Sequence, residues 1–447
     1  MIILKSPNLV LGLFLYIYIM KISDLHALYL DCNAVCTDTR TVATNDMFFA
    51  LTGDNFNGNT FALKALKAGA KYAIIDDSEY HIPNQTIIVE DVLKTLQTLA
   101  TFHRDYLNIP IIGLTGSNGK TTTKELINAV LSQKFATTAT LGNLNNHIGV
   151  PLTLLSMNAE TEIGIVEMGA NHLKEIEFLS NIAKPNFGYI TNFGKAHLEG
   201  FGSIEGVIQG KSELYHFLKS TGGHVFINKK DSKQVELTTD LKTTSFGDET
   251  TDAEILINLI TADPFVISEY NNLNIASQLI GTYNFTNISA AITIGAYFKV
   301  QDTDIKTAIE TYTPTNNRSQ IITKGSTKII LDAYNANPTS MKAALESFHT
   351  LKDTRKIAII GDMFELGDEA TKEHQNIVDL ATTLNIDKVY IIGHLFKDTL
   401  TSSNKIITAY NTFEAFKSEL KQQEFQNTTI LIKASRGMKL ERILDLI

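Results

Sequence analysis

Residues that mark a disulfide scaffold or a metal protein are nearly missing from this sequence. Its 447 residues include no Trp, 8 Pro and 2 Cys. The two cysteines, Cys32 and Cys36, form one C-x-x-x-C pair with no His/Cys cluster nearby, so they give neither a disulfide framework nor a complete zinc site. We therefore expect two reduced thiols in a cytoplasmic protein.

An excess of basic residues is also missing. The chain carries 39 Lys and Arg against 48 Asp and Glu, a formal net charge of -9. This balance argues against a general nucleic-acid-binding protein, although a local basic pocket remains possible. With 44% hydrophobic and 19% charged residues, the composition is that of an ordinary globular protein, and the length suggests two to four domains.

Long hydrophobic runs are limited to residues 8–20, NLVLGLFLYIYIM. This run is shorter than the about 20 residues that a membrane-spanning helix needs. It could be the core of a signal peptide, but no small-x-small cleavage site follows it. Because Met20 opens a segment typical of a soluble start, we interpret residues 1–19 as a non-native or disordered extension and expect no stable membrane insertion. A membrane tether is the alternative.

Short apolar segments rich in β-branched residues alternate with segments of helical periodicity, which predicts an α/β fold around mostly parallel sheets. We predict three domains. Residues 20–106 form a small α/β domain, residues 107–313 a central P-loop ATPase-like domain, and residues 314–447 a Rossmann-like domain. No GxGxxG motif opens the last domain, so a dinucleotide site there has little support.

The segment GLTGSNGKTTTKELINAV, residues 113–130, resembles a Walker A loop with a shifted glycine. The usual pattern would place a glycine at position 114, where this chain has Leu114. A short apolar strand precedes the loop and a helical pattern follows it, which is the context that a phosphate-binding loop requires. Lys120 would contact the β- and γ-phosphates, and the Thr121 hydroxyl would bind Mg²⁺. A glycine turn that only caps a helix is the alternative.

Two further polar residues follow predicted strands. The segment IGIVE places Glu167 at the end of a strand, where the open edge of an α/β sheet binds ligands, and a carboxylate there suits Mg²⁺. A solvated strand-end glutamate is the alternative. His197 lies in the turn after the strand FGYI; taken alone, it is more often a structural residue than a ligand.

Lys211 lies on the apolar face of a predicted helix. On a helical wheel started at Ile204 it falls at about 340°, between Val207 at about 300° and Tyr215 at about 20°. The lysine could extend outward to solvent. If it stays buried, desolvation favours the neutral amine, which reacts with CO₂ to give a carbamate that can bind a second Mg²⁺.

Together these segments resemble the Mur ligases, the ATP-dependent amide-forming enzymes of peptidoglycan synthesis. The loop TGSNGKTTT has that family's own glycine spacing. The segments GNLNNHIGVPLTLL, VEMGANHLKEIEFL, AHLEGFGS, YNANPTSMKAAL, GDMFELGDEA and LIKASRGM resemble the branch that adds D-alanyl-D-alanine to UDP-N-acetylmuramoyl-tripeptide. The resemblance covers residues 20–447 and implies a monomeric ligase that forms an acyl phosphate, with ATP and two Mg²⁺ ions as cofactors and no nucleic-acid partner.

The resemblance also implies roles for individual residues. The catalytic set is Lys120, Glu167, His197 and Lys211. The metal ligands are Thr121, Glu167, His197 and the carbamate of Lys211. The ATP-binding set is Thr115, Gly116, Ser117, Asn118, Gly119, Lys120, Thr121, Thr122, Asn287, Arg318 and Asp332. The substrate-binding set is Thr39, Arg40, Asn143, Asn145, Asn146, His147, Tyr334, Asn335 and Asn337.

Some positions depart from the family pattern. Leu331 replaces the first carboxylate of the usual DDSYNANP, so any role of that acid is absent or moved, and Ala434 replaces a glycine. Three other functions remain open. The chain could be another Mur-type carboxylate–amine ligase, or a folylpolyglutamate synthase, whose phosphate loop is similar. A non-catalytic nucleotide-binding module would bind ATP without substrate-dependent ADP release.

Overall fold

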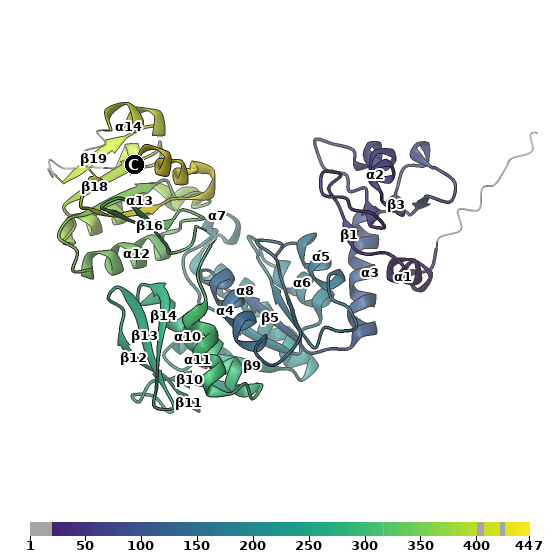
Figure 1. The fold of residues 1–447 in the computed structure, drawn as a ribbon, viewed down its shortest axis with the longest axis horizontal. Coiled ribbons are helices and arrows are strands. Elements are labelled where there is room, and N and C mark those ends of the chain that lie inside the picture. Colours follow the sequence, from purple (N-terminus) through teal and green to yellow (C-terminus); the bar gives the residue numbers. More distant parts are fainter. Residues whose placement is uncertain (1–19, 316, 400–405, 421–424) are drawn as a thin grey trace, which may run out of the picture. The chain divides into compact units, whose positions relative to one another are not determined.

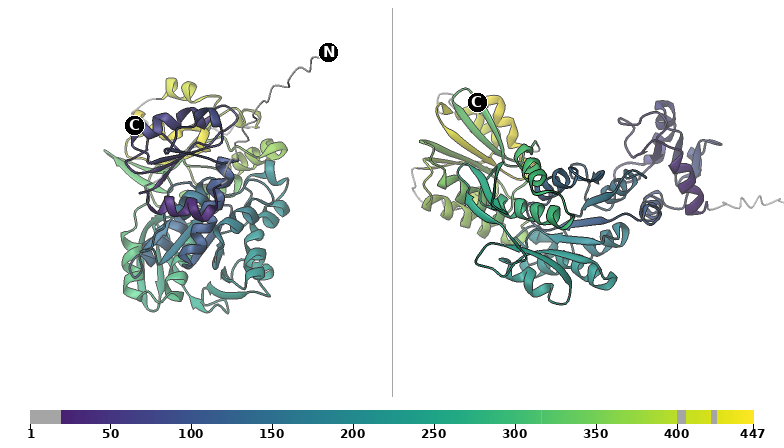
Figure 2. Two further views of the ribbon diagram at one scale, coloured as in Figure 1. Left: turned by 90° about the vertical axis from the view of Figure 1, so that its right-hand side faces the viewer. Right: turned by 60° about the horizontal axis from the view of Figure 1, so that its bottom comes forward.

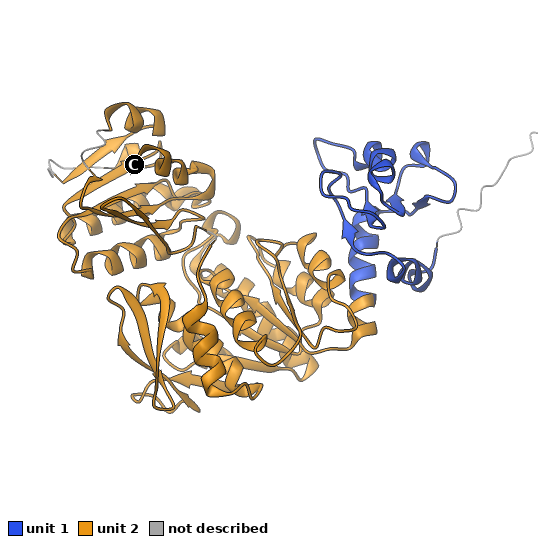
Figure 3. Ribbon diagram, viewed as in Figure 1, with its two compact units in different colours: residues 1–102 blue, residues 103–447 orange. Residues whose placement is uncertain are grey.

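The computed structural model describes residues 20–315, 317–399, 406–420 and 425–447. The apolar run and the extension predicted for residues 1–19 lie outside this part. Contacts divide the chain into two compact units, Met1–Phe102 and His103–Ile447 (Figure 3). Within the described ranges, no helix is long and apolar enough to cross a membrane. The three domain boundaries predicted above remain a prediction.

The first unit is built on a small parallel sheet of four strands in the order β1-β2-β3-β4. Side chains such as Phe48, Ala65 and Ile75 form its core. Its strands are β1 (Val35–Cys36), β2 (Met47–Phe49), β3 (Tyr72–Ile75) and β4 (Thr86–Ile88). Its helices are α1 (Ile22–Leu30), α2 (Ala62–Ala68), two 3₁₀ turns (Gly58–Phe61 and Ser78–Tyr80) and the start of α3 (Val92–Leu107).

The second unit begins with a parallel sheet of seven strands in the order β11-β10-β9-β8-β5-β7-β6. Its strands are β5 (Ile111–Thr115), β6 (Thr137–Ala139), β7 (Ile163–Glu167), β8 (Phe187–Ile190), β9 (His224–Asn228), β10 (Lys242–Gly247) and β11 (Ile255–Leu256). Strand β5 pairs in parallel with both β7 and β8. The segments that follow these three strands therefore meet at one sheet edge, where open α/β sheets bind ligands.

Helices of this part bury the apolar stripes that the sequence shows. Leu126, Ile127, Val130 and Leu131 of α4 are fully buried, as their spacing predicts. The helices are α4 (Lys120–Leu131), α5 (Gly149–Leu155), α6 (Glu175–Ala183), α7 (Leu198–Phe201), α8 (Ile204–Thr221), α9 (Ser232–Leu237), α10 (Tyr283–Tyr297) and α11 (Asp302–Thr311).

An antiparallel sheet of three strands, which sequence reasoning missed, precedes α10. Its strands are β12 (Asn258–Thr261), β13 (Phe265–Tyr270) and β14 (Leu273–Ile280). It packs against α10 and α11 (Figures 1 and 2). Val266, Ile275 and Leu279 join the core under the seven-stranded sheet. This sheet holds the start of α10, and with it Asn287, in place.

The last part of the chain forms a sheet of six strands in the order β15-β16-β20-β17-β18-β19. Only the β15–β16 pair is antiparallel. The strands are β15 (Gln320–Lys324), β16 (Thr327–Asp332), β17 (Lys356–Gly361), β18 (Lys388–Ile392), β19 (Ile407–Tyr410) and β20 (Thr429–Lys433). This mixed α/β architecture confirms the predicted fold class.

The helices of this part are α12 (Pro338–Thr350), α13 (Ala370–Thr383) and α14 (Phe413–Glu419), with 3₁₀ turns at Gly367–Glu369, Phe396–Asp398, Arg436–Met438 and Leu440–Leu446. In the sequence of this part, the segments TKIILDAY, KIAIIGDM, KVYIIGHL and TTILIKAS each lead into a helix-like stretch, which predicts an α-helix after each of β16, β17, β18 and β20. In the part of the chain that the structure describes, β18 and β20 are followed by 3₁₀ turns, and the segment after β18 lies partly outside that part. The prediction of an α-helix after β20 was wrong, because Lys439, with φ 51° in the left-handed region, interrupts the segment between its two 3₁₀ turns.

Candidate active site

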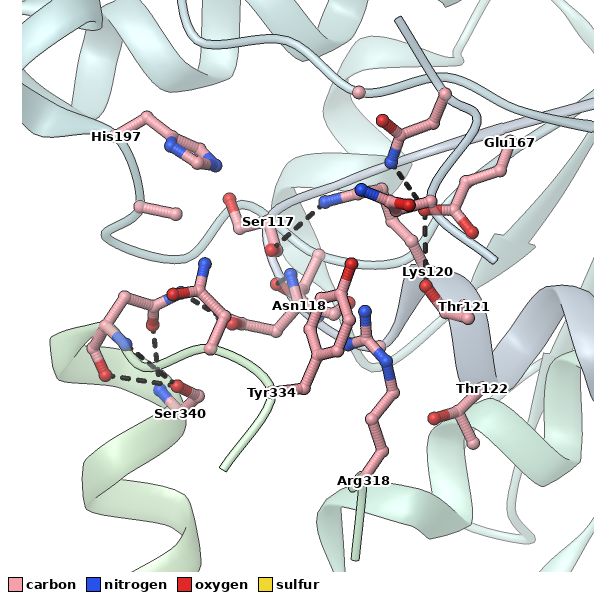
Figure 4. Close-up of a pocket in the computed structure, with 18 of the residues that line it drawn as sticks. Ser117, Asn118, Lys120, Thr121, Thr122, Glu167, His197, Arg318, Tyr334 and Ser340 are labelled. Carbon is pink, nitrogen blue, oxygen red and sulfur yellow. Dashed lines mark hydrogen bonds between the residues drawn. The ribbon is translucent and has the colours of Figure 1, made fainter. Parts of the chain in front are cut away.

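A cavity of about 580 Å³ lies at the carboxyl ends of β5, β7 and β8. Residues of the phosphate loop, of the loops after β6, β7 and β8, and of the six-stranded part line it (Figure 4). The predicted residues that line it are Ser117, Asn118, Gly119, Lys120, Thr121, Thr122, Asn143, Asn145, Asn146, His147, Glu167, His197, Asn287, Arg318, Asp332, Tyr334, Asn335 and Asn337. The structure thus gathers segments that are more than 200 residues apart along the chain.

The phosphate loop needs its glycines for steric reasons. Gly116 has φ +140°, and a Cβ there would lie 2.0 Å from Thr191 Oγ1. Gly119 has φ +80°, and a Cβ there would lie 2.5 Å from Asn287 Oδ1. The loop therefore passes close to β8 and to α10 in a conformation that only glycine adopts easily.

Lys120 opens α4 and turns back over the loop. Its ammonium donates to the carbonyl oxygens of Gly116 at 2.7 Å and Ser117 at 3.3 Å. Burial lowers the pKa of Lys120, and the nearby Glu167 carboxylate opposes that shift. An anion seated on the helix N-terminus would meet this ammonium together with free backbone N–H groups.

Glu167 is buried, with 1% of its surface exposed, so the solvated alternative is wrong. Its Oε1 accepts hydrogen bonds from Thr121 Oγ1 at 3.3 Å and from Asn145 Nδ2 at 2.8 Å. Its Oε2 lies 3.9 Å from the ammonium of Lys124, a buried residue that sequence reasoning missed. Lys124 follows Lys120 by one helical turn, which is the signal that could have identified it.

Several buried polar atoms around the loop have no hydrogen-bond partner in the described chain. They are Thr115 Oγ1, Asn118 Nδ2, Glu167 Oε2 and Arg318 Nε. Buried polar groups are almost always paired, so a cluster of unpaired atoms indicates a polar ligand. Both hydrogen-bond donors and carboxylate oxygen are represented, which suits a phosphate group together with a cation.

The oxygen donors fit Mg²⁺ bound with phosphate. Within the described residues, no group of three or more His, Cys, Asp and Glu side chains could hold a metal on its own. Mg²⁺ is usually held by one or two carboxylates plus substrate phosphates rather than by a protein cage. The Thr121 hydroxyl and the unpaired Glu167 Oε2 have this chemistry.

Lys211 lies fully buried behind the cavity wall, on the face of α8 that the helical wheel predicts, so the solvent-directed alternative is wrong. Its ammonium donates to the Ala170 carbonyl at 2.8 Å and lies 4.9 Å from the Phe201 ring centre. Burial lowers the pKa of Lys211 well below its usual range, and the positive charge of Lys120 adds to the effect.

His197 precedes α7 in a left-handed conformation with φ 53°. Its ring points toward the cavity (Figure 4). Its Nδ1 lies 2.5 Å from Oε2 of Glu365, a residue of the loop after β17. This hydrogen bond lowers the pKa of the Glu365 carboxyl.

The six-stranded part supplies cationic and amide groups. The Arg318 guanidinium stacks 3.7 Å from the Tyr334 ring centre. Asp332 accepts a hydrogen bond at 2.6 Å from Lys433, a lysine that the sequence did not single out although it lies in the motif LIKASRGM. Asn337 caps α12 and donates to Asn118 Oδ1 of the phosphate loop at 2.7 Å.

Not every predicted residue lines the cavity. Thr115 and Gly116 are not among the residues that line it, although the Thr115 hydroxyl is one of the unpaired atoms. Thr39 and Arg40 belong to the first unit, where the Arg40 side chain pairs with Asp38 at 2.5 Å. Leu331 is buried in β16, so the carboxylate that it replaces would not face this cavity without a change in the strand.

Comparisons with known proteins agree with this geometry. Residues 114–295 match the family model of the Mur ligase middle domain, and residues 317–436 match that of the Mur ligase glutamate ligase domain. The chain is 36% identical over 428 residues to the UDP-N-acetylmuramoyl-tripeptide–D-alanyl-D-alanine ligase of Bacillus subtilis (strain 168), with 93% of each chain covered.

Solved structures give the same result. A crystal structure of MurF from Acinetobacter baumannii superposes with a TM-score of 0.82 at 29% identity, covering 92% of each chain. The MurF ligase from Thermotoga maritima in complex with ADP superposes with a TM-score of 0.79 at 24% identity, covering 94% of this chain and 97% of that one. This second likeness supports the fold alone. The similarity to the Bacillus subtilis ligase, the two matched family models and the Acinetobacter baumannii structure show that the chain belongs to the MurF branch of the Mur ligase family.

Proposed function

We propose that this chain is an ATP-dependent ligase that joins D-alanyl-D-alanine to UDP-N-acetylmuramoyl-tripeptide, giving ADP, phosphate and the pentapeptide. The observation that carries the proposal is the cluster of unpaired polar atoms around a phosphate loop that faces Glu167. The relatives in the MurF branch carry the name of this reaction. The sequence does not distinguish meso-diaminopimelate from lysine at the third peptide position.

We assign the predicted site residues to two groups of ligands. The phosphate loop, Asn287, Arg318 and Asp332 would bind ATP. The asparagine-rich loop after β6 and residues 334–337 would border the tripeptide and the dipeptide, and the region around Arg40 would bind the UDP-sugar. A first divalent cation held by Thr121 and Glu167, and a second that His197 would help to hold, would offset the negative charge of the phosphates.

The first chemical step activates the peptide carboxylate. Hydroxide is a poor leaving group, so a carboxylate and an amine do not condense directly in water. The terminal carboxylate oxygen of the tripeptide bonds to the γ-phosphorus of ATP, the bond to the β–γ bridging oxygen breaks, and ADP leaves. Lys120 offsets the repulsion between these two anions.

The second step forms the amide. The free amine of D-alanyl-D-alanine attacks the acyl carbon, the bond from that carbon to the phosphate oxygen breaks, and phosphate leaves with a proton from the amine. Water would hydrolyse the acyl phosphate, so the residues around it must exclude solvent. The walls contributed by the seven-stranded and six-stranded parts of the second unit would serve this purpose.

We further propose that Lys211 reacts with CO₂ to form a carbamate that carries part of a second cation site. The lowered pKa favours the neutral amine, and only the neutral form attacks CO₂. One proton leaves the nitrogen as the N–C bond forms. The resulting anion would lie close to the cavity, because Lys211 contacts the Ala170 carbonyl and Ala170 lines the cavity.

The decisive experiment measures phosphate release from ATP with UDP-N-acetylmuramoyl-tripeptide and D-alanyl-D-alanine, omitting each in turn. We expect release only with all three, and a pentapeptide product by mass spectrometry. Release with folate and glutamate instead would identify the folate-type ligase. ATP binding without any substrate-dependent release would identify a non-catalytic module.

We place this reaction in the cytoplasm, because ATP is its co-substrate and the cysteines Cys32 and Cys36 are free.

We also propose that the chain acts as a monomer. Both groups of ligands are then bound by one copy, so sedimentation at working concentrations should give the mass of a single chain, 49.4 kDa.

A further inference from the structure

The motif GDMFELGDEA stands out in the sequence but has no role in the chemistry above. It follows β17, and its Glu365 reaches His197 across the cavity edge, with Nδ1 and Oε2 2.5 Å apart. The contact is reinforced by the backbone, since the Glu199 N–H donates to the Glu365 carbonyl at 3.1 Å. The Gly367 backbone also packs close to Glu199.

The loop that presents Glu365 is fixed at its base. The Met363 N–H donates to Nε2 of the buried His374 at 3.0 Å, and the Phe364 N–H donates to Ser435 Oγ at 2.9 Å. His374 is held in turn by its Nδ1, 2.7 Å from the Ala370 carbonyl. Glu365 itself has φ 62°, a left-handed conformation that these anchors impose. The backbone that presents the Glu365 carboxylate is therefore held in place.

This contact determines which imidazole nitrogen is available. A carboxylate only accepts hydrogen bonds, so Nδ1 of His197 must carry the proton. In the neutral ring, Nε2 then keeps its lone pair, and only a nitrogen with a free lone pair can bind a cation. Histidines that bind metals are commonly held in this way by a carboxylate on the other nitrogen.

We propose that Glu365 is a positioning residue for the ligase reaction, which fixes the Nδ1–H tautomer and the orientation of His197 so that Nε2 faces the cation. The purpose of the cation in this inference rests on the proposed function, whereas the tautomer of His197 does not depend on it. It also makes the cation site depend on the six-stranded part, because His197 follows β8 and Glu365 follows β17.

The test is ¹⁵N NMR of histidine-labelled full-length protein at about pH 8, above the ordinary histidine pKa of about 6.5. The His197 signals are assigned by their loss in His197→Gln. We expect protonated Nδ1 and unprotonated Nε2 in the wild-type protein. In Glu365→Ala, His197 should change toward the Nε2–H tautomer that a free histidine side chain favours, whereas Glu365→Gln, which keeps an acceptor oxygen, should retain the wild-type pattern.

Metal binding gives a second readout, measured as Mn²⁺ binding by electron paramagnetic resonance in the presence of ADP. We expect Glu365→Ala to weaken Mn²⁺ binding about 10-fold, as loss of an outer-shell partner typically does. Glu365→Gln should keep most of the affinity. Glu369→Ala is the matched control, because Glu369 is in the same motif, is exposed and pairs only with the surface residue Lys372 in the contacts described.

An Nε2–H tautomer in the wild-type protein, or an unchanged tautomer in Glu365→Ala, would overturn the proposal. Unchanged Mn²⁺ affinity in Glu365→Ala would also overturn it. These readouts do not require turnover. A chain without ligase activity that still shows the tautomer change would therefore refute the proposed function and leave the role of Glu365 intact.

Discussion

The phosphate loop has little room for an added side-chain atom. Gly116 approaches the Thr191 side chain closely enough that a methyl group would overlap it, whereas Gly325, in the turn between β15 and β16, has φ +57° and open space around its Cα. Substitutions at these two glycines therefore distinguish the effect of a steric clash from the effect of backbone strain alone.

We therefore predict that Gly116→Ala abolishes measurable ATP binding by calorimetry, because the loop must move away from β8 to admit the methyl group. Gly325→Ala carries only the strain of a left-handed alanine, about 1 kcal/mol, and should bind ATP like the wild-type protein. Equal loss of binding in the two variants would mean that general destabilisation, not loop geometry, is the cause.

The carbamate proposal also belongs to the residue scale. Lys211→Ala should lower ligase activity at least about 100-fold, because it removes a group that stabilises transition-state charge. Activity should partly return with added formate or acetate, which can occupy the vacated position. Lys219→Ala, on the exposed face of the same helix and paired with Asp240, is the control. A fully active Lys211→Ala enzyme would end the carbamate proposal.

At the scale of whole elements, the start of α12 is connected to the phosphate loop. Asn337 forms a capping box at its start with Ser340, and Pro338 occupies the first turn. The same Asn337 side chain donates to Asn118. One amide thus stabilises a helix end through its oxygen and holds the phosphate loop through its nitrogen.

Two substitutions separate these roles. Asn337→Ala should lower stability by about 1 kcal/mol, the usual effect of losing a helix cap, and should also weaken ATP binding. Asn337→Ser keeps a capping oxygen, so its melting temperature should stay near the wild-type value while ATP binding weakens. Thermal melting by circular dichroism and calorimetry with ATP measure the two effects. Wild-type ATP affinity in both variants would show that the bond to Asn118 does not matter for binding.

At the scale of the whole molecule, the reaction requires water to be kept from the acyl phosphate. We predict that the chain becomes more compact when a non-hydrolysable ATP analogue and the tripeptide are bound together. Small-angle X-ray scattering should show a smaller radius of gyration with both ligands than with neither. An unchanged radius would mean that the site excludes water without large movement.

Much of the site could be predicted because its signals are local. Lys211 shows its burial through its position among apolar neighbours at helical spacing, and Glu167 shows its place through the apolar strand before it. The three-stranded antiparallel sheet was missed although β14 alternates between exposed and buried residues. Its alternation is visible in the sequence, but the strands with which it pairs are not.

The sequence by itself determined the strand–loop–helix unit around the phosphate loop, the alternating α/β order and the buried faces of α4 and α8. These depend on backbone geometry and on residues a few positions apart. Only the tertiary structure decided that Lys124 lies beside Glu167, that Asn337 holds Asn118 and that Glu365 orients His197. Such contacts join residues distant in sequence, and their geometry is fixed by how sheets and helices pack, which no local pattern contains.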